Sequence, residues 1–126
     1  SDVAYSIIKN TNLMGLDHDE INMVAMIVRL YPRNKPYDSY YYSILPSDQK
    51  VIVSKLASIL KIADAVDASH KEKGKKISCK IKDNEFVITC DTSEDMSFEK
   101  WAFENRSVMF EDVMGIKPVL KTRREG

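Results

Sequence analysis

The sequence has few of the residues from which most recognisable sites are built. Of its 126 residues, two are histidine, two are cysteine and four are glycine. It contains no glycine-rich phosphate loop, no GxSxG nucleophile motif, and neither an HExxH nor an HxxHD metal motif. Cys79 and Cys90 form no CxxC pair, so we expect free thiols in a reducing cytoplasm. With so few histidines, any metal site would consist mainly of carboxylates.

Charge and hydropathy exclude further classes of protein. Lysine plus arginine and aspartate plus glutamate both number 19, so the overall charge predicts neither a nucleic-acid nor a membrane partner. No apolar run approaches the roughly 20 residues of a transmembrane helix. The opening SDVAYSIIKN lacks the basic start and apolar centre of a signal peptide. Because the chain begins without Met and already in a helical pattern, we expect it to be a segment of a longer protein.

Apolar periodicity predicts an α+β fold, with a helical part over residues 1–74 and a small ββαβ domain over residues 75–126. Helices are expected over residues 2–10, 17–31, 47–71 and 97–114, and strands over residues 77–81, 86–90 and 116–121. Asp17 and Glu20 have the spacing of a capping box at the start of the second helix. Ser47 is expected to cap the third helix, and the glycines Gly74 and Gly115 are expected to end the third and fourth.

The first two predicted strands form a hairpin whose register follows from their apolar residues. A two-residue turn at Asp83-Asn84 places apolar side chains opposite one another on one face of the hairpin. The expected pairs are Ile81 with Phe86, Cys79 with Ile88, and Ile77 with Cys90.

The helix predicted over residues 47–71 combines an apolar stripe with carboxylates. At 100° per residue the stripe contains Val53, Leu56, Leu60 and Ala63, extended by Ile52 and Ile59. Asp67 lies near the middle of the stripe, with Asp64 at one margin and His70 at the other. The expected outer face is Ser54, Ser58, Lys61, Ala65 and Ser69. On the helix over 97–114, the expected inward residues are Phe98, Trp101, Ala102, Met109 and Val113.

Two interpretations of the carboxylates stay open. Asp64 and Asp67, three residues apart, could share a divalent cation such as Mg²⁺ or Mn²⁺. Alternatively, they could cap neighbouring helices or pair with Arg29 or Arg33 in a purely structural network. His70, in the last expected turn of the helix, could interact with the helix dipole and have no other role.

A cluster of lysines is the second candidate site. Lys71, Lys73, Lys75 and Lys76 lie close together, and Lys80 and Lys82 line the outward face of the next strand. These cations form a positive strip that could bind a nucleic acid or a phosphate chain. The alternative is a solvated helix end followed by a charged strand edge that discourages sheet-to-sheet association.

Three stretches of the sequence occur in the order Y.IIKN..L.GL...E...VA.IVR.Y.R..P, then KLASILKIADAVDASH, and after the hairpin FEKWAFEN....FEDVMGIKPVL. In this order they resemble the C-terminal portion of the bacterial exopolyphosphatase and guanosine pentaphosphate phosphohydrolase family. The most specific is ILKIADAVDASH, which is similar to the family pattern ADALDRSH. The resemblance covers essentially the whole chain.

The resemblance implies a division of labour in the parent enzyme. Catalysis, with Mg²⁺, would lie in N-terminal actin-like domains that this chain does not contain. The chain itself would be the end of a helical domain similar to the HD phosphohydrolases, followed by a small α/β domain. Asp64 would match the last metal-ligand aspartate of HD enzymes, although the other ligands of that site are missing. The HD at His18-Asp19 is not that dyad, because it lies in the first turn of a helix.

Two positions depart from the family pattern. The chain has Tyr31-Pro32-Arg33 where the family commonly reads YHR, and Asp67-Ala68-Ser69-His70 where it commonly reads DRSH. A histidine and an arginine that could contact phosphate are therefore replaced. This weakens the expectation of a phosphate contact through the helix that carries Asp67.

Three functional hypotheses follow from the sequence. The first is a non-catalytic, cytoplasmic fragment without a cofactor of its own that holds polyphosphate or guanosine pentaphosphate and supports a homodimer. The residues expected to hold the polyanion are Lys71, Lys73, Lys75, Lys76, Arg29, Arg33 and His70. The second is a remnant of an HD-type metal-dependent phosphohydrolase that uses Asp64. The third is a purely structural dimerisation module, in which Asp64 and Asp67 organise the helix interface.

Overall fold

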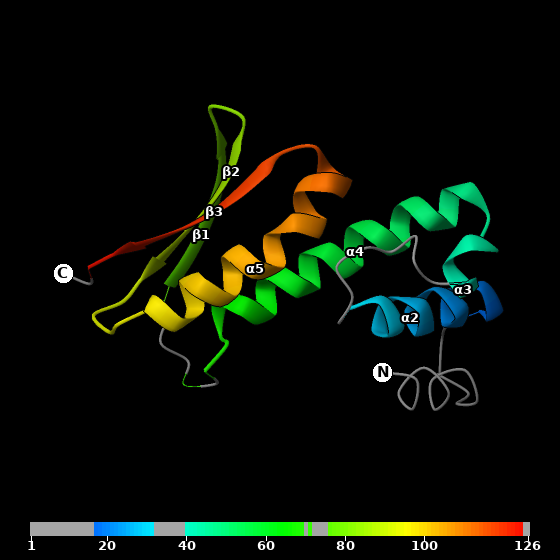
Figure 1. Cartoon of the computed structure of the whole chain (residues 1–126), viewed down its shortest axis with the longest axis horizontal. Coiled ribbons are helices and arrows are strands. Elements are labelled where there is room, and N and C mark those ends of the chain that lie inside the picture. The colour runs from blue at the N-terminus through cyan, green and yellow to red at the C-terminus, as the bar shows by residue number, and fades with distance from the viewer. Residues whose placement is uncertain (1–16, 32–39, 70, 72–75, 125–126) are drawn as a thin grey trace. The chain divides into compact units, whose positions relative to one another are not determined.

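The computed structural model describes residues 17–31, 40–69, 71 and 76–124, and confirms the α+β class (Figure 1). Its helices are α2 (His18–Leu30), α3 (Tyr40–Ser43), α4 (Ser47–Val66) and α5 (Ser97–Met114). Its strands are β1 (Lys76–Lys82), β2 (Glu85–Asp91) and β3 (Lys117–Arg123). The helix expected over residues 2–10 lies outside the described residues. The chain divides into two compact units, Ser1–Ser58 and Ile59–Gly126, and the division lies inside α4.

In the first unit, the start of α2 follows the sequence prediction closely. The Asp17 side chain accepts a hydrogen bond from the Glu20 backbone N–H at 2.8 Å, and the Glu20 side chain accepts one from the Asp17 backbone N–H at 3.3 Å. This confirms the capping box, which satisfies two backbone donors at the helix start. The short helix α3 was not expected from the sequence. Ser47, expected as a cap, is the first residue of α4.

In the second unit, a three-stranded sheet has the order β1-β2-β3. The β1–β2 hairpin has the predicted register, with Ile81 opposite Phe86, Cys79 opposite Ile88 and Ile77 opposite Cys90. Asp83 and Asn84 both have positive φ, 53° and 62°, as a two-residue type I′ turn requires. Strand β3 pairs with β2 in parallel, so β2, α5 and β3 form a βαβ unit with α5 as its crossover.

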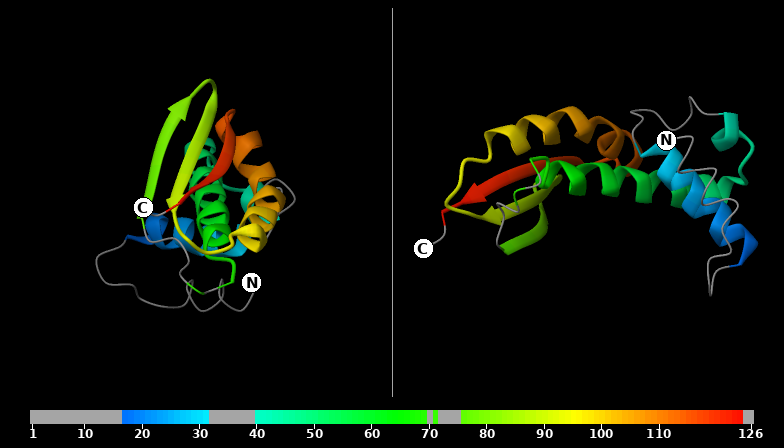
Figure 2. Two further views of the ribbon diagram at one scale, coloured as in Figure 1. Left: turned by 90° about the vertical axis from the view of Figure 1, so that its left-hand side faces the viewer. Right: turned by 90° about the horizontal axis from the view of Figure 1, so that it is seen from below.

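Helix α5 and the last turns of α4 lie on one side of this sheet (Figure 2, left). The core between them consists of Ile62, Ala65, Val66, Ile88, Cys90, Met96, Ala102, Phe103 and Phe110. Phe86 of β2 stacks on Phe110 of α5 with ring centroids 5.5 Å apart. Gly115 ends α5 with a φ of 71°, the left-handed conformation expected of a glycine at that position.

The predicted faces of α4 are wrong at most positions, although Val53 of the expected apolar stripe is buried. The expected outer residues Ser54, Ser58, Lys61 and Ala65 are buried, whereas Leu56, Ile59 and Leu60 are 41–47% exposed. Burying the serines costs little, because their hydroxyls bond to carbonyls of their own helix. Ser54 Oγ donates to the Lys50 carbonyl at 2.7 Å, and Ser58 Oγ donates to the Lys55 carbonyl at 2.8 Å.

The expected end of α4 and the expected inward face of α5 also need correction. Helix α4 ends at Val66, and not near Lys71, with a tighter turn in which the Asp67 and Ala68 N–H groups donate to carbonyls three residues earlier. Gly74, the expected stop, lies outside the described residues. On α5, Ala102 and Met109 are buried as expected. Phe98 and Trp101 are 53% and 62% exposed, because Phe103 and Phe110 occupy the face toward the sheet.

Candidate functional site

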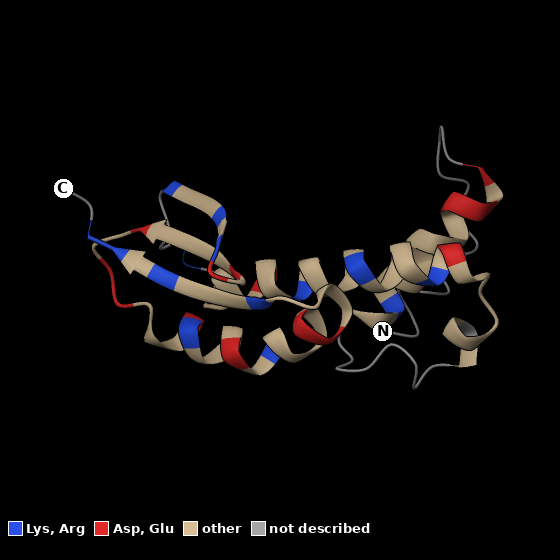
Figure 3. Ribbon diagram, turned by 90° about the horizontal axis from the view of Figure 1, so that it is seen from above, with Lys and Arg blue, Asp and Glu red and all other residues tan. Residues whose placement is uncertain are grey.

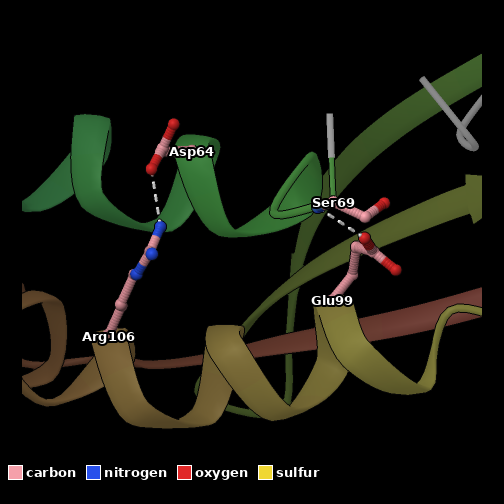
Figure 4. Close-up of polar contacts among 4 residues, drawn as sticks. All are labelled: Asp64, Ser69, Glu99 and Arg106. Atoms are coloured by element: carbon pink, nitrogen blue, oxygen red, sulfur yellow. Dashed lines mark hydrogen bonds and ion pairs between the residues drawn. The ribbon is translucent and has the colours of Figure 1, made fainter. Parts of the chain in front are cut away.

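Asp64, the first of the two carboxylate candidates, lies where α4 meets α5 in the second unit (Figure 4). Asp64 accepts a hydrogen bond from the Arg106 guanidinium of α5 at 2.6 Å, and the two side chains form an ion pair. The sequence suggested Arg29 or Arg33 as partners of this carboxylate and did not single out Arg106. Asp67 is half-buried in the turn after α4. The ion pair with Arg106 supports the structural interpretation of Asp64.

Two further charged residues of the second unit, Glu99 and Lys61, are buried. Glu99 is fully buried on α5, and its carboxylate accepts a hydrogen bond at 2.9 Å from the backbone N–H of Ser69 in the turn after α4. Lys61 is only 5% exposed, and burial together with the nearby positive charge of Arg106 lowers the pKa of its ammonium group. A cation site at Asp64 would have to compete with Arg106.

The donor set does not fit a metal ion at this position. Within residues 17–31, 40–69, 71 and 76–124, no three His, Cys, Asp or Glu side chains converge as metal ligands. A divalent cation in a protein needs several oxygen ligands. Asp64 is already paired with the Arg106 guanidinium. We therefore derive no chemistry from a metal here.

The second candidate site is the lysine cluster, which continues onto the β-sheet. The strands determine which charged side chains share one face of that sheet. Successive residues of a strand point to opposite faces. Since Phe86, Ile88 and Cys90 face the helices, the residues between them on β2 face the other side, together with their partners on β1 and β3. We call this side the open face. Its residues are Lys76, Ser78, Lys80, Lys82, Glu85, Val87, Thr89, Asp91, Lys117, Val119, Lys121 and Arg123.

The register orders the open face into four cross-strand rows. They are Lys82, Glu85 and Lys117; then Lys80, Val87 and Val119; then Ser78, Thr89 and Lys121; and finally Lys76, Asp91 and Arg123. Each carboxylate lies on the central strand between two cations. Six cations face two carboxylates, so the face is positive, and its Lys and Arg positions lie on both outer strands (Figure 3).

The spacing of these charges is short on the scale of electrostatic screening. Neighbouring strands lie about 4.8 Å apart, and residues two apart on a strand lie about 6.7 Å apart. Both distances are below the Debye length of about 8 Å at physiological salt. The six cations therefore act on a ligand as one charged surface.

One edge of the open face is fixed by a bidentate ion pair. Arg123 Nε and one terminal nitrogen donate to the two carboxylate oxygens of Asp91, at 2.8 and 3.0 Å. These hydrogen bonds lower the pKa of Asp91 and raise that of Arg123. In the middle rows, Lys80 and Lys121 face the uncharged neighbours Val87 and Thr89. We expect these two lysines to be the most available to an anion.

A groove in the same unit differs from the open face in its balance of charge. A groove of about 430 Å³ lies between α5 and β3. Its charged lining consists of Lys100 and Lys117 together with Glu85 and Glu104, over an apolar floor that includes Phe103 and Leu120. Because its cations and carboxylates balance, it does not favour a polyanion.

The residues predicted to bind a polyanion fall into three groups. Lys71 and Lys76 are described and exposed, and Lys76 begins β1 on the open face. Arg29 is half-buried in the last turn of α2, in the first unit. The structure does not describe Arg33, His70, Lys73 or Lys75. For these four residues, polyanion binding stays a prediction.

Sequence reasoning found the part of the open face on β1 and missed the part on β3. Lys117, Lys121 and Arg123 join Lys80 and Lys82 only because β3 pairs with β2 in parallel. A signal was present, since KPVLKTR has its cations at the first, fifth and seventh positions, as KISCKIK does. This spacing reveals a charged face on each strand but not that the two strands share a sheet.

Comparison with known proteins does not identify the chain. No family model matches it, and no curated protein matches its sequence. In the described part of the chain, no helix has the length and apolar character needed to cross a membrane.

Proposed function

We propose that this chain is a polyphosphate-holding C-terminal segment of a cytoplasmic exopolyphosphatase-like enzyme. The observation that carries the proposal is the open face, where six cations on two outer strands surround only two carboxylates. The resemblance of ILKIADAVDASH and the closing FEDVMGIKPVL to that family supports the choice of a phosphate chain as the ligand. Guanosine pentaphosphate is the second ligand that the family implies.

The open face suits holding a ligand better than transforming one. Lysine is a compact point charge on a flexible stem, which can follow a mobile phosphate chain without fixing a single geometry. Each phosphate contact releases counterions, so many weak contacts add up to binding that falls steeply with salt. Hydrolysis of the terminal phosphoanhydride bond, with Mg²⁺, is assigned in this proposal to N-terminal domains outside the chain.

The lysine strip would extend the open face toward α4. Lys76 belongs to both, and Lys71 is exposed just after the turn that ends α4. For Lys73, Lys75, His70, Arg29 and Arg33, a contribution to polyphosphate binding stays a prediction from the sequence.

A titration of the chain with long-chain polyphosphate at several salt concentrations tests the proposal. Lys80→Glu and Lys121→Glu each reverse one charge in the middle of the open face. Lys55→Glu makes the same change at an exposed position on α4. We expect each open-face variant to weaken binding about tenfold and to lower the salt slope by about one, with Lys55→Glu close to the unmodified chain.

Two results would count against the proposal. Equal losses in all three variants would mean that net charge alone attracts polyphosphate. Absence of binding at low salt would remove the holding role and leave dimerisation as the better account. A further variant with Lys71, Lys73, Lys75 and Lys76 changed to Ser measures the contribution of the strip.

Dimerisation is a second candidate function, and an exposed aromatic pair favours it. Phe98 and Trp101 are 53% and 62% exposed on α5, with ring centroids 5.9 Å apart. Exposed aromatic side chains are enriched in protein interfaces. We expect sedimentation to show a homodimer that Phe98→Lys with Trp101→Lys converts to a monomer. A monomer at all concentrations in the unmodified chain would contradict this role.

A further inference from the structure

Within the described residues, an apolar part of the sheet on strand β1 is not covered by a helix. All seven of its residues are exposed, whereas every residue of the central strand β2 is buried or half-buried. Ile77 and Ile81 are 52% and 72% exposed, although Cys90, opposite Ile77, is fully buried. Figure 2 (left) shows β1 at the edge of the sheet far from α5. The apolar side of the sheet therefore continues beyond the helices that cover it.

The turn determines which backbone groups of β1 remain unpaired. In a two-residue hairpin the residues that flank the turn, here Lys82 and Glu85, form a hydrogen-bonded pair. Hydrogen-bonded and non-hydrogen-bonded pairs then alternate along the ladder. The N–H and C=O groups of Ile77, Cys79 and Ile81 therefore point away from β2. This free edge could form a complete set of hydrogen bonds with a further strand.

A second copy of the chain is a poor occupant of this edge. Antiparallel pairing of two β1 strands about Cys79 would place Lys76 opposite Lys82 and Ser78 opposite Lys80 on the open face. Like charges directly opposite each other destabilise a sheet. The lysines thus oppose pairing of β1 with itself, and they favour a strand with negative side chains at the same positions.

We propose that β1 docks an extended segment of a partner protein in which apolar residues alternate with aspartate or glutamate. The partner strand adds to the free edge through the backbone groups of Ile77, Cys79 and Ile81. Its apolar side chains cover Ile77 and Ile81, and its carboxylates lie beside Lys76, Lys80 and Lys82. This inference does not rest on the proposed polyphosphate binding. The two ligands would share lysines and would therefore compete.

The proposal is tested by comparing peptide binding to the unmodified chain and to a variant in which the free edge of β1 is blocked. The probe is a peptide of about nine residues with alternating valine and glutamate, a typical strand length, and its control has the same composition without the alternation. Cys79→Pro removes one outward N–H from the middle of the edge and leaves the β1–β2 ladder intact, as proline is tolerated at such positions. Cys79→Val is the matched control that keeps the N–H group.

We expect the alternating peptide to bind the unmodified chain and Cys79→Val equally, and to bind Cys79→Pro about tenfold more weakly. Polyphosphate binding should be the same in all three proteins, because their lysines are unchanged. That second readout separates failure of this inference from failure of the proposed function. Ile77→Glu with Ile81→Glu supplies a second test, since both side chains are exposed and the change repels the carboxylates of the peptide.

Three results would overturn the proposal. The first is equal binding of the alternating peptide and its control, which would indicate charge attraction without strand addition. The second is undiminished binding to Cys79→Pro and to the Ile77→Glu, Ile81→Glu variant. The third is concentration-dependent self-association of the unmodified chain that Cys79→Pro abolishes, which would make a second copy the occupant.

Discussion

The two faces of the β-sheet are built from the same three strands and differ in almost every property. On the covered face, Ile88 and Cys90 are buried against α5 and the end of α4. On the open face, lysines and an arginine on the outer strands surround the central strand. Because side chains alternate along a strand, one sequence pattern encodes a core and a charged surface at once. The comparison shows how a small domain can present dense positive charge without losing stability.

The covered face itself differs between its central and its edge strand. Ile88 on β2 is 6% exposed, whereas Ile81 on β1 is 72% exposed on the same side of the sheet. The residue type is the same, so the difference comes from position, because Ile88 lies on the central strand against the helices and Ile81 lies on an edge strand. Stability should therefore depend on β2 and not on β1.

The largest loss of stability is expected from a substitution at the centre of the covered face. Ile88→Ala should lower the free energy of unfolding by about 2–5 kcal/mol, because it removes buried methyl groups and leaves a cavity. Ile81→Ala, the same change at the uncovered position, should stay within about 0.5 kcal/mol. Urea denaturation of both variants measures the difference. Similar losses at the two positions would mean that β1 is covered in solution.

A second prediction concerns the turn that sets which residues belong to which face. Asn84 has a φ of 62°, a conformation that a β-branched residue adopts poorly. Asn84→Val should destabilise the chain by about 1–2 kcal/mol, whereas Asn84→Gly should leave stability unchanged or raise it slightly. Thermal unfolding of the two variants tests this. Equal stability of both would show that the turn does not constrain the hairpin.

A third prediction compares a buried lysine with the exposed ones. Burial and Arg106 lower the pKa of Lys61, so the folded state disfavours its charged form. The resulting penalty is present at neutral pH and is relieved as the pH rises through the lowered pKa toward the ordinary value of 10.5. The stability of the unmodified chain should therefore rise relative to that of Lys61→Met as the pH rises through this range. Denaturation at several pH values checks this trend, and a stability difference that does not change with pH would contradict it.

The smallest predicted effect concerns the ion pair at one end of the open face. Hydrogen bonds from Arg123 lower the pKa of Asp91 below its ordinary value of 3.8. The stabilisation is present above that ordinary value and is lost as the pH falls through the lowered pKa. Arg123→Gln should therefore be slightly less stable than the unmodified chain at neutral pH and equally stable in strong acid. A stability difference that persists in acid would point to a contribution other than this carboxylate.

The sequence predicts the parts of the fold that local chemistry determines. Alternation in both strands, joined at Asp83-Asn84, fixes the hairpin register, and Asp17 with Glu20 marks the start of α2. The faces of α4 were not predictable by hydrophobicity, because Ser54 and Ser58 satisfy their hydroxyls within the helix and can be buried. On α5, the aromatic residues on both sides of the helix gave no way to choose Phe103 and Phe110 over Phe98 and Trp101.

Only part of the candidate site was predictable, and the reason lies in the order and pairing of the strands. Lys76, Lys80 and Lys82 are close in sequence and share a strand, so their grouping follows from period-two alternation. Lys117, Lys121 and Arg123 lie a whole crossover helix away, and their place beside β2 depends on parallel pairing. Long-range pairing of this kind has no local sequence signal comparable to a hairpin turn.

The most direct test of the account is a map of backbone amide chemical shifts as long-chain polyphosphate is added to the chain at low salt. We predict shifts concentrated on β1 and β3 around Lys80 and Lys121, reversed by added salt, with the exposed side of α5 around Trp101 unaffected. Shifts centred on α5 or on the groove beside Phe103, or an unchanged spectrum, would contradict the assignment of polyphosphate to the open face.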